Sequence, residues 1–194
     1  LDVQGVEDAT TITAIADQST DEDTTLRVIA FTIDDAETAA GSLTLSFSAA
    51  DPSLIAGHSF GGSGANRTLE IVPAADQNGT TLVTVTVDDG GLTGQADFQL
   101  TIDSVNDLPT VAPAISMLDK NVNEDAAVPS ELLTVDDVES GGAGVTVTAS
   151  SDNQTLVPDA NLTVTDNGGG DRTLGVTLAA NENGTANITV TLDD

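Results

Sequence analysis

Residues 82–102 read LVTVTVDDGGLTGQADFQLTI, and this stretch decides the fold. Apolar and polar side chains alternate from Val83 to Val87 and again from Ala96 to Ile102. Alternation with a period of two is typical of β-strands with one buried face. The intervening Asp88-Asp89-Gly90-Gly91 run has the residue types of a tight hairpin turn. The stretch therefore predicts two antiparallel neighbouring strands.

Shorter segments of the same kind precede this hairpin. They cover residues 24–25, 26–33, 43–47, 58–61 and 68–72, and turn residues separate them. Together with the hairpin they predict about seven short strands, as in an all-β sandwich. No stretch of the chain shows sustained helical periodicity.

The strand pattern occurs twice along the chain. Three acidic runs at residues 21–23, 34–37 and 87–89 return in the same order at 123–125, 136–139 and 192–194. The offset is 102 residues for the first two runs (Glu22 to Glu124) and 105 for the third (Asp88 to Asp193). A fixed order at a nearly constant offset predicts two tandem copies of one module.

The repeat predicts where the modules begin and end. We assign residues 1–11 to the tail and linker of a preceding repeat, 12–105 to a first module, 106–116 to a linker, and 117–194 to a second module whose final strand is absent. Pro109 and Pro113 predict an extended and semi-rigid linker, because proline fixes its own φ and restricts its predecessor. We expect the chain to be nearly two periods of a longer array.

Composition excludes several classes of partner. The chain has 32 acidic and four basic residues, for a formal net charge of -28. Nucleic acids and anionic membranes would be repelled by such a surface, so we expect neither as a partner, and no direct membrane insertion. There is no cysteine to form disulfides and no Trp or Tyr, so the cores must be built from aliphatic residues.

The acidic residues lie at the predicted turns. In a seven-stranded antiparallel sandwich, we expect the start of the first strand, the second-to-third turn and the sixth-to-seventh turn to share one end. This places the acids of each module together with those of the linker that precedes it. For the first module the predicted cluster is Glu7, Asp8, Glu22, Asp23, Asp34, Asp35, Glu37, Asp88 and Asp89, and for the second it is Asn106, Asp107, Glu124, Asp125, Asp136, Asp137, Glu139, Asp193 and Asp194.

A cluster of this kind predicts a calcium site. Converging carboxylates repel one another unless a cation lies between them. Ca²⁺ takes six to eight oxygen ligands with tolerant geometry, so about two or three ions would fit each inter-module junction. Zinc and copper prefer His or Cys, and the chain has one His and no Cys. The alternative is that these Asp and Asn residues serve only their own turns, or that acidity serves only solubility.

Three motifs carry a resemblance to a known family. The runs at residues 22–24 (Glu-Asp-Thr), 87–91 (Val-Asp-Asp-Gly-Gly) and 105–109 (Val-Asn-Asp-Leu-Pro) resemble the signatures of immunoglobulin-like and cadherin-like tandem repeats of giant bacterial adhesins of the RTX type, secreted by type I systems. The resemblance implies Greek-key β-sandwich modules arranged end to end, stiffened by calcium, at the bacterial cell surface or in biofilms. The chain departs from the pattern at Ala126, which stands where the first module has Thr24, and at residues 6–9, which lack the linker proline.

The sequence favours a structural role over catalysis. His58 is the single imidazole and has no counterpart in the second module, and no residue pattern places a base beside an activated nucleophile. We therefore expect a non-catalytic, extracellular extender whose partners are the neighbouring repeats of its own chain. Two alternatives are a filament subunit, in which other copies donate a strand to the second module, and a ligand-binding adhesin tip.

Overall fold

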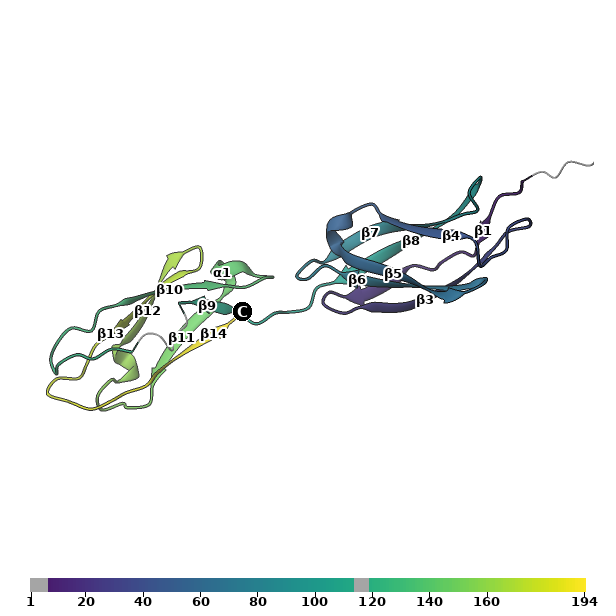
Figure 1. Ribbon diagram of the computed structural model, residues 1–194. Helices are drawn as coiled ribbons and strands as arrows, with labels where there is room; N and C mark the ends of the chain where they lie inside the picture. The colour runs from purple at the N-terminus through teal and green to yellow at the C-terminus, as the bar shows by residue number, and fades with distance from the viewer. Residues whose placement is uncertain (1–6, 114–118) are drawn as a thin grey trace, which may run out of the picture. The chain divides into compact units, whose positions relative to one another are not determined.

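The computed structural model describes residues 7–113 and 119–194, except for the side chain of Arg27. The start of the predicted leading tail (1–6), the end of the predicted linker (114–116) and the first two residues of the predicted second module (117–118) lie outside these ranges. The chain divides into two compact units, Leu1–Val105 and Asn106–Asp194. Each unit is described by itself below (Figure 1).

The first unit consists of two four-stranded sheets packed face to face. One sheet has the order β1 (Thr11–Ile12), β3 (Leu26–Asp34), β6 (Asn66–Pro73), β5 (Ile55–Ser63); the other has the order β2 (Gln18–Asp21), β8 (Thr93–Asp103), β7 (Gly79–Asp88), β4 (Thr44–Ala49). All neighbouring strands are antiparallel except β2 and β8, which are parallel. A 3-10 turn, η1 (Pro52–Leu54), joins β4 to β5. This is the strand order of an immunoglobulin-like sandwich.

The core of the first unit follows from the alternation in the sequence. Val83, Val85 and Val87 on β7 are fully buried, and so are the inward-facing residues of β8, from Phe98 to Ile102. The β7–β8 hairpin pairs Leu82 with Gln99 and Asp88 with Thr93, and the two strands are antiparallel neighbours as residues 82–102 predict. The predicted fold class, all-β with tandem immunoglobulin-like or cadherin-like sandwich modules, is therefore confirmed.

The opening of the first unit differs from the prediction. Residues 24–25 do not begin the first strand of the sandwich. They lie in the loop between β2 and β3. The first strand lies upstream and is divided, with β1 in one sheet and β2 in the other. Its two short halves alternate over too few residues to give a clear strand pattern, which is why the sequence did not reveal them.

The second unit repeats most of this arrangement. One sheet has the order β12 (Leu162–Gly168), β13 (Asp171–Val176), β10 (Glu131–Asp136), β9 (Thr110–Ala112), and the other pairs β11 (Thr146–Ser151) with β14 (Ile188–Asp193). A one-turn helix, α1 (Gly141–Gly144), precedes β11, and a 3-10 turn, η3 (Asp159–Asn161), precedes β12. Within the residues that the structure describes, β2 and β8 have no counterpart in this unit.

Strand register defines the two ends of each unit. In the first unit, β1 starts where β3 ends, with Thr11 opposite Asp34, and the β7–β8 turn lies at the same end, where the Thr10 hydroxyl donates to Val87 O at 3.0 Å. We call this end the N-terminal pole. At the opposite end, the C-terminal pole, β2 finishes beside the end of β8, with Asp21 level with Asp103. The same names are used for the second unit, in which β9 begins at the N-terminal pole with Thr110 opposite Asp136.

Candidate metal centres at the poles

The structure divides each predicted acidic cluster between two poles. Glu22 and Asp23 precede β3, whereas Asp34, Asp35 and Glu37 follow it, so the nine-residue strand separates them. At ~3.3 Å per residue this amounts to roughly 30 Å. The prediction that Glu22 and Asp23 converge with the other acids of their module is therefore wrong. It is also wrong for Glu124 and Asp125, which precede β10 in the same way.

The remaining predicted acids of the first module do share its N-terminal pole. The residues there are Asp8, Asp34, Asp35, Glu37, Asp88 and Asp89, and Glu7 directly precedes Asp8 in the leading segment. Asp35 Oδ1 accepts the N–H groups of Glu37 (3.0 Å) and Thr38 (2.6 Å), and Glu37 Oε2 accepts the N–H of Asp8 at 3.3 Å. These bonds hold the leading segment against the β3–β4 loop.

The β7–β8 turn contributes the other half of this pole. Asp89 Oδ1 accepts the N–H groups of Leu92 (2.7 Å) and Gly91 (2.6 Å), and these two bonds lower the pKa of Asp89 below its ordinary value. Asp88 Oδ1 accepts the N–H of Gly90 at 2.7 Å. In both Asp35 and Asp89 the second oxygen, Oδ2, is buried and has no hydrogen-bond partner among the described residues.

The N-terminal pole of the second unit repeats this geometry. Asp137, only 6% exposed, is the counterpart of Asp35. Its Oδ1 accepts the N–H groups of Ser140 (2.7 Å) and Glu139 (3.2 Å), bonds that lower the pKa of Asp137, while its Oδ2 is buried and unpartnered within the described chain. Glu139 Oε2 accepts the N–H of Asp107 at 3.1 Å, as Glu37 does with Asp8.

The other predicted ligands of the second module lie around this pole. Asp136 Oδ1 accepts the N–H groups of Asp137 (3.0 Å) and Gly142 (3.1 Å). Asp193 is paired with Thr146 at the start of β11, and Asp194 follows it. Asn106 is exposed and donates its side-chain amide to Asp107 O at 3.2 Å.

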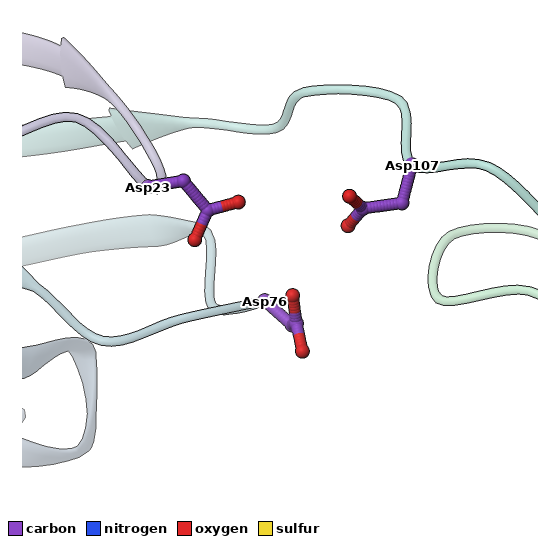
Figure 2. A group of neighbouring side chains, drawn as sticks. All are labelled: Asp23, Asp76 and Asp107. Carbon is purple, nitrogen blue, oxygen red and sulfur yellow. The ribbon is translucent and has the colours of Figure 1, made fainter.

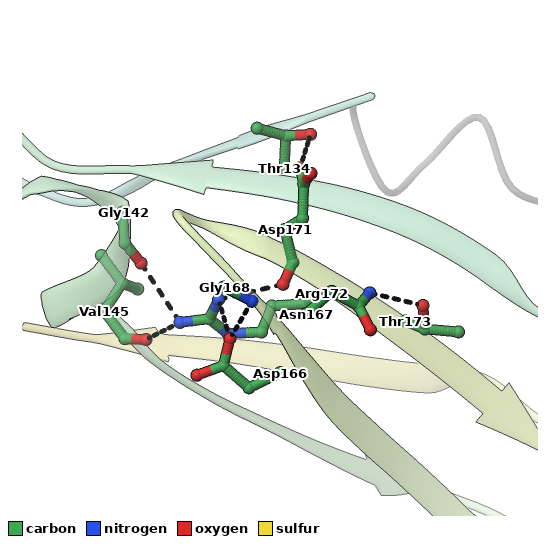
Figure 3. A network of polar contacts seen from close by, with 9 residues as sticks. All are labelled: Thr134, Gly142, Val145, Asp166, Asn167, Gly168, Asp171, Arg172 and Thr173. Carbon is green, nitrogen blue, oxygen red and sulfur yellow. Dashed lines mark hydrogen bonds and ion pairs between the residues drawn. The ribbon is translucent and has the colours of Figure 1, made fainter.

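One arginine in each unit holds the acidic loop in place, and the sequence did not assign it that role. Arg172 is only 4% exposed. Its Nη2 donates to Gly142 O (3.1 Å) and Val145 O (3.0 Å), and its Nη1 donates to Asp166 Oδ1 at 2.9 Å (Figure 3). Arg67 Nη2 donates to Ala40 O at 2.9 Å. Since Ala40 and Gly142 each lie three residues beyond the glutamate of the acidic run, both arginines make the same contact.

The C-terminal pole of the first unit is built around Glu22. This side chain is only 2% exposed. Its Oε1 accepts the N–H of Val105 at 3.0 Å, and its backbone N–H donates to Asp103 O at 2.9 Å. Its Oε2 is buried without a hydrogen-bond partner in the part of the chain described. A fully buried carboxylate with one free oxygen is costly unless a cation is bound to it.

Asp76 joins this pole, although the sequence did not single it out. One carboxylate oxygen of Asp76 lies within 4.8 Å of one of Asp23. Figure 2 shows the two residues on separate loops and also labels Asp107, which follows Val105 by two residues. In the second unit the corresponding residues are Asp125 and Asn181, and Asp125 Oδ1 accepts the Asn181 N–H at 3.0 Å. All four have φ between 55° and 60°, so one pair of left-handed turns occurs in both units. That shared turn was the available signal for Asp76.

The donor atoms at both poles fit a hard divalent cation. The carboxylate and carbonyl oxygens described above are the ligands that Ca²⁺ prefers. Both N-terminal poles and the C-terminal pole of the first unit have at least one buried carboxylate oxygen with no hydrogen-bond donor among the described residues. The fold and these poles define the class of molecule: tandem β-sandwich units with acidic, oxygen-lined ends.

Comparison with known proteins gives distant structural likenesses. A scan against protein-family models and a search of curated proteins found no match. Among solved structures, the chain is similar to protocadherin gamma B7 extracellular cadherin domains 1–4, with 15% identity, a TM-score of 0.43, and coverage of 95% of this chain and 49% of that one. It is similar to titin domains Z1Z2 in complex with telethonin, with 12% identity, a TM-score of 0.40, and coverage of 97% and 96%.

A third likeness is to an endo-fucoidan hydrolase of glycoside hydrolase family 107, with 18% identity, a TM-score of 0.39, and coverage of 93% of this chain and 27% of that one. The chain thus spans about half of that protocadherin fragment and about a quarter of that hydrolase. None of the three likenesses is close enough to assign a function. No helix within residues 7–113 and 119–194 has the length and apolar character that crossing a bilayer requires.

Proposed function

We propose that this chain is a non-catalytic pair of extender modules from a bacterial cell-surface adhesin or biofilm protein, and that Ca²⁺ binds at its poles. The observation that carries the proposal is the repeated state of Asp35 and Asp137. In each, Oδ1 is saturated by two loop N–H groups while Oδ2 is buried and unpartnered among the described residues. Bound calcium would supply the missing partner at both places.

Calcium at the poles would stiffen the connection between the units. Glu22 holds the N–H of Val105 and Glu139 holds the N–H of Asp107, so Asn106 alone separates two anchored backbone positions. An ion bound to Glu22 would restrict the motion of the backbone at Val105, and an ion bound to the Asp137–Glu139 loop would restrict it at Asp107. A chain of such modules would then project a distal binding region away from the cell. Extracellular calcium is abundant enough for modules of modest affinity.

The test is calcium binding by the full chain after removal of metal with EDTA. We expect isothermal titration calorimetry to detect saturable binding of several ions. The double variant Asp35→Asn and Asp137→Asn should bind fewer ions, because it removes one unpartnered carboxylate oxygen at each N-terminal pole. Asp97→Asn is the matched control, since it removes an exposed carboxylate that already accepts the Thr84 hydroxyl at 2.6 Å. No calcium binding, or the same loss in the control, would refute the proposal.

Solution scattering tests the mechanical part of the proposal. Calcium should increase the maximum dimension of the two-unit chain or narrow its distribution of dimensions, because restrained anchors limit bending at Asn106. Identical scattering curves in EDTA and calcium, measured on protein that binds calcium, would refute the stiffening role without contradicting the metal sites.

A further inference from the structure

The first unit has an aromatic edge where β4 and β5, the last strands of its two sheets, meet. Phe47 of β4 stacks on His58 of β5 with ring centroids 4.2 Å apart, and His58 makes an edge-to-face contact with Phe60 at 5.8 Å. His58 is exposed, and both phenylalanines are half-buried. By strand pairing, the same three positions of the second unit are aliphatic: Ala149, Leu162 and Val164. A sandwich of this kind therefore closes its edge without aromatic rings.

Arg67 belongs to the same edge and lacks the ion pair that its counterpart makes. Its partner across β5 and β6 is Gly62. In the second unit the same pairing joins Arg172 to Asp166, whose carboxylate lies 2.9 Å from the guanidinium. Arg67 Nη2 donates to Ala40 O, but its Nε is buried and has no hydrogen-bond partner among the described residues. Arg67 thus has donors that the described chain leaves unused.

The chain around this arginine supplies no carboxylate to it. Gly62 has a φ of 85°, and a Cβ at this position would overlap Asn66 O, so no side chain can take the place that Asp166 has in the second unit. Residues 38–50 and 52–69 contain no acid, in a chain that has 32 acidic residues. The first unit therefore presents an arginine without a carboxylate of its own in a neutral surrounding.

We infer that this edge binds a short saccharide that carries one carboxylate, as in a neutral sugar linked to a uronic acid. The guanidinium of Arg67 pairs with the carboxylate, because charge-assisted bonds to a forked donor are strong and directional. The net charge of -28 would repel a ligand with many negative charges, so a single carboxylate is favoured over a polyanion. The inference does not depend on calcium at the poles.

The aromatic residues provide the rest of the binding surface. Phe60 and His58 lie two and four residues before Gly62 along β5, so about 13 Å of edge extends from the arginine to the imidazole. All three face the opposite sheet, because they pair with residues on the side of the buried Leu69. The apolar faces of a disaccharide lie against the half-buried phenylalanine rings, and its hydroxyls bond to the ring nitrogens of His58, which donate and accept.

An NMR titration of the full chain in calcium tests the inference. The probe is cellobiouronic acid, which is cellobiose with one terminal glucose oxidised to glucuronic acid, and cellobiose is the matched neutral ligand. We expect saturable shift changes at Phe47, His58, Phe60 and the Nε–H of Arg67. The acid should bind on the order of tenfold more tightly than cellobiose, because only the acid pairs with the guanidinium.

Three variants locate the site. His58→Leu introduces the residue type of the second unit, so the fold and calcium binding should persist while affinity for the acid falls by on the order of tenfold. Arg67→Lys should cause a similar loss, because lysine keeps the charge and lacks the fork. Ser59→Ala is the matched control: Ser59 is exposed on the same strand and faces the other side of the sheet, so the affinity should not change.

Several outcomes would overturn the inference. They are no saturable binding, equal affinity for cellobiose and its acid, shift changes away from this edge, and unchanged affinity in both His58→Leu and Arg67→Lys. N-acetylaspartate amide that binds as tightly as cellobiouronic acid would also overturn it, since the edge would then recognise a peptide carboxylate and not a sugar. Loss of saccharide binding in a variant that still binds calcium separates this site from the metal centres.

Discussion

Replacing Glu22 by glutamine should have little effect on stability in EDTA and a large effect in calcium. Glutamine keeps the size of the side chain and the acceptor for the Val105 N–H, and it removes the charge on the buried, unpartnered oxygen. We therefore expect the free energy of unfolding of the first unit to change by no more than about 1 kcal/mol without metal. With calcium at 100 times its dissociation constant, the wild type gains about 2.7 kcal/mol from each ion that binds only the folded state. The variant should lose most of that gain.

The difference is measurable by calorimetric melting of the full chain. For a unit of this size, about 1 kcal/mol corresponds to roughly 4–8 °C in melting temperature, so the calcium-dependent difference should be about 10–20 °C. Asp97→Asn, on the exposed face of β8, should melt like the wild type in both conditions. An equal loss of melting temperature in EDTA and in calcium would refute the reasoning, because Glu22 would then act only as a hydrogen-bond acceptor for the protein itself.

Three further predictions concern the N-terminal poles. Arg172→Lys should weaken calcium binding at the second unit several-fold, as measured by calorimetric titration, because lysine cannot reproduce the forked contacts to the acidic loop; unchanged affinity would contradict this. Gly94→Ala should lower the free energy of unfolding by about 1–3 kcal/mol in urea titrations, because a Cβ at this position would lie 2.2 Å from Thr10 O. An unchanged free energy of unfolding would show that the leading segment is not packed as described. In EDTA, the free energy of unfolding should fall as the pH drops below about 4. The N–H groups of Leu92 and Gly91 lower the pKa of Asp89 from 3.8, so the stabilisation from its carboxylate is present above that value and is lost as the folded carboxyl protonates. Melting temperatures that stay constant from pH 5 to 3 would contradict this.

The strands were predictable because their signal is local. Each strand of the hairpin at residues 82–102 alternates between apolar and polar residues, and the structure pairs the two strands antiparallel as predicted. The repeated acidic runs were equally clear. The division of these acidic runs between the two poles could not be predicted, because it depends on whether a strand precedes residues 22–25. That strand is split into β1 and β2, and each half is too short to show a period of two.

The parts of the site that escaped prediction depend on contacts between distant residues. Arg172 reaches Gly142, thirty residues away in the sequence, and no local pattern in the sequence indicates that contact. Asp76 is a single acid in a loop, and only the folded chain places its carboxylate near that of Asp23. Burial of one oxygen of Glu22 likewise follows from packing and not from composition.

The parallel pairing of β2 with β8 has a mechanical consequence. Tension applied to the first unit from its two ends pulls β2 toward the N-terminal pole and β8 toward the C-terminal pole. The ladder from Gln18↔Leu100 to Asp21↔Asp103 is then loaded in shear, so its hydrogen bonds must fail together and not one after another.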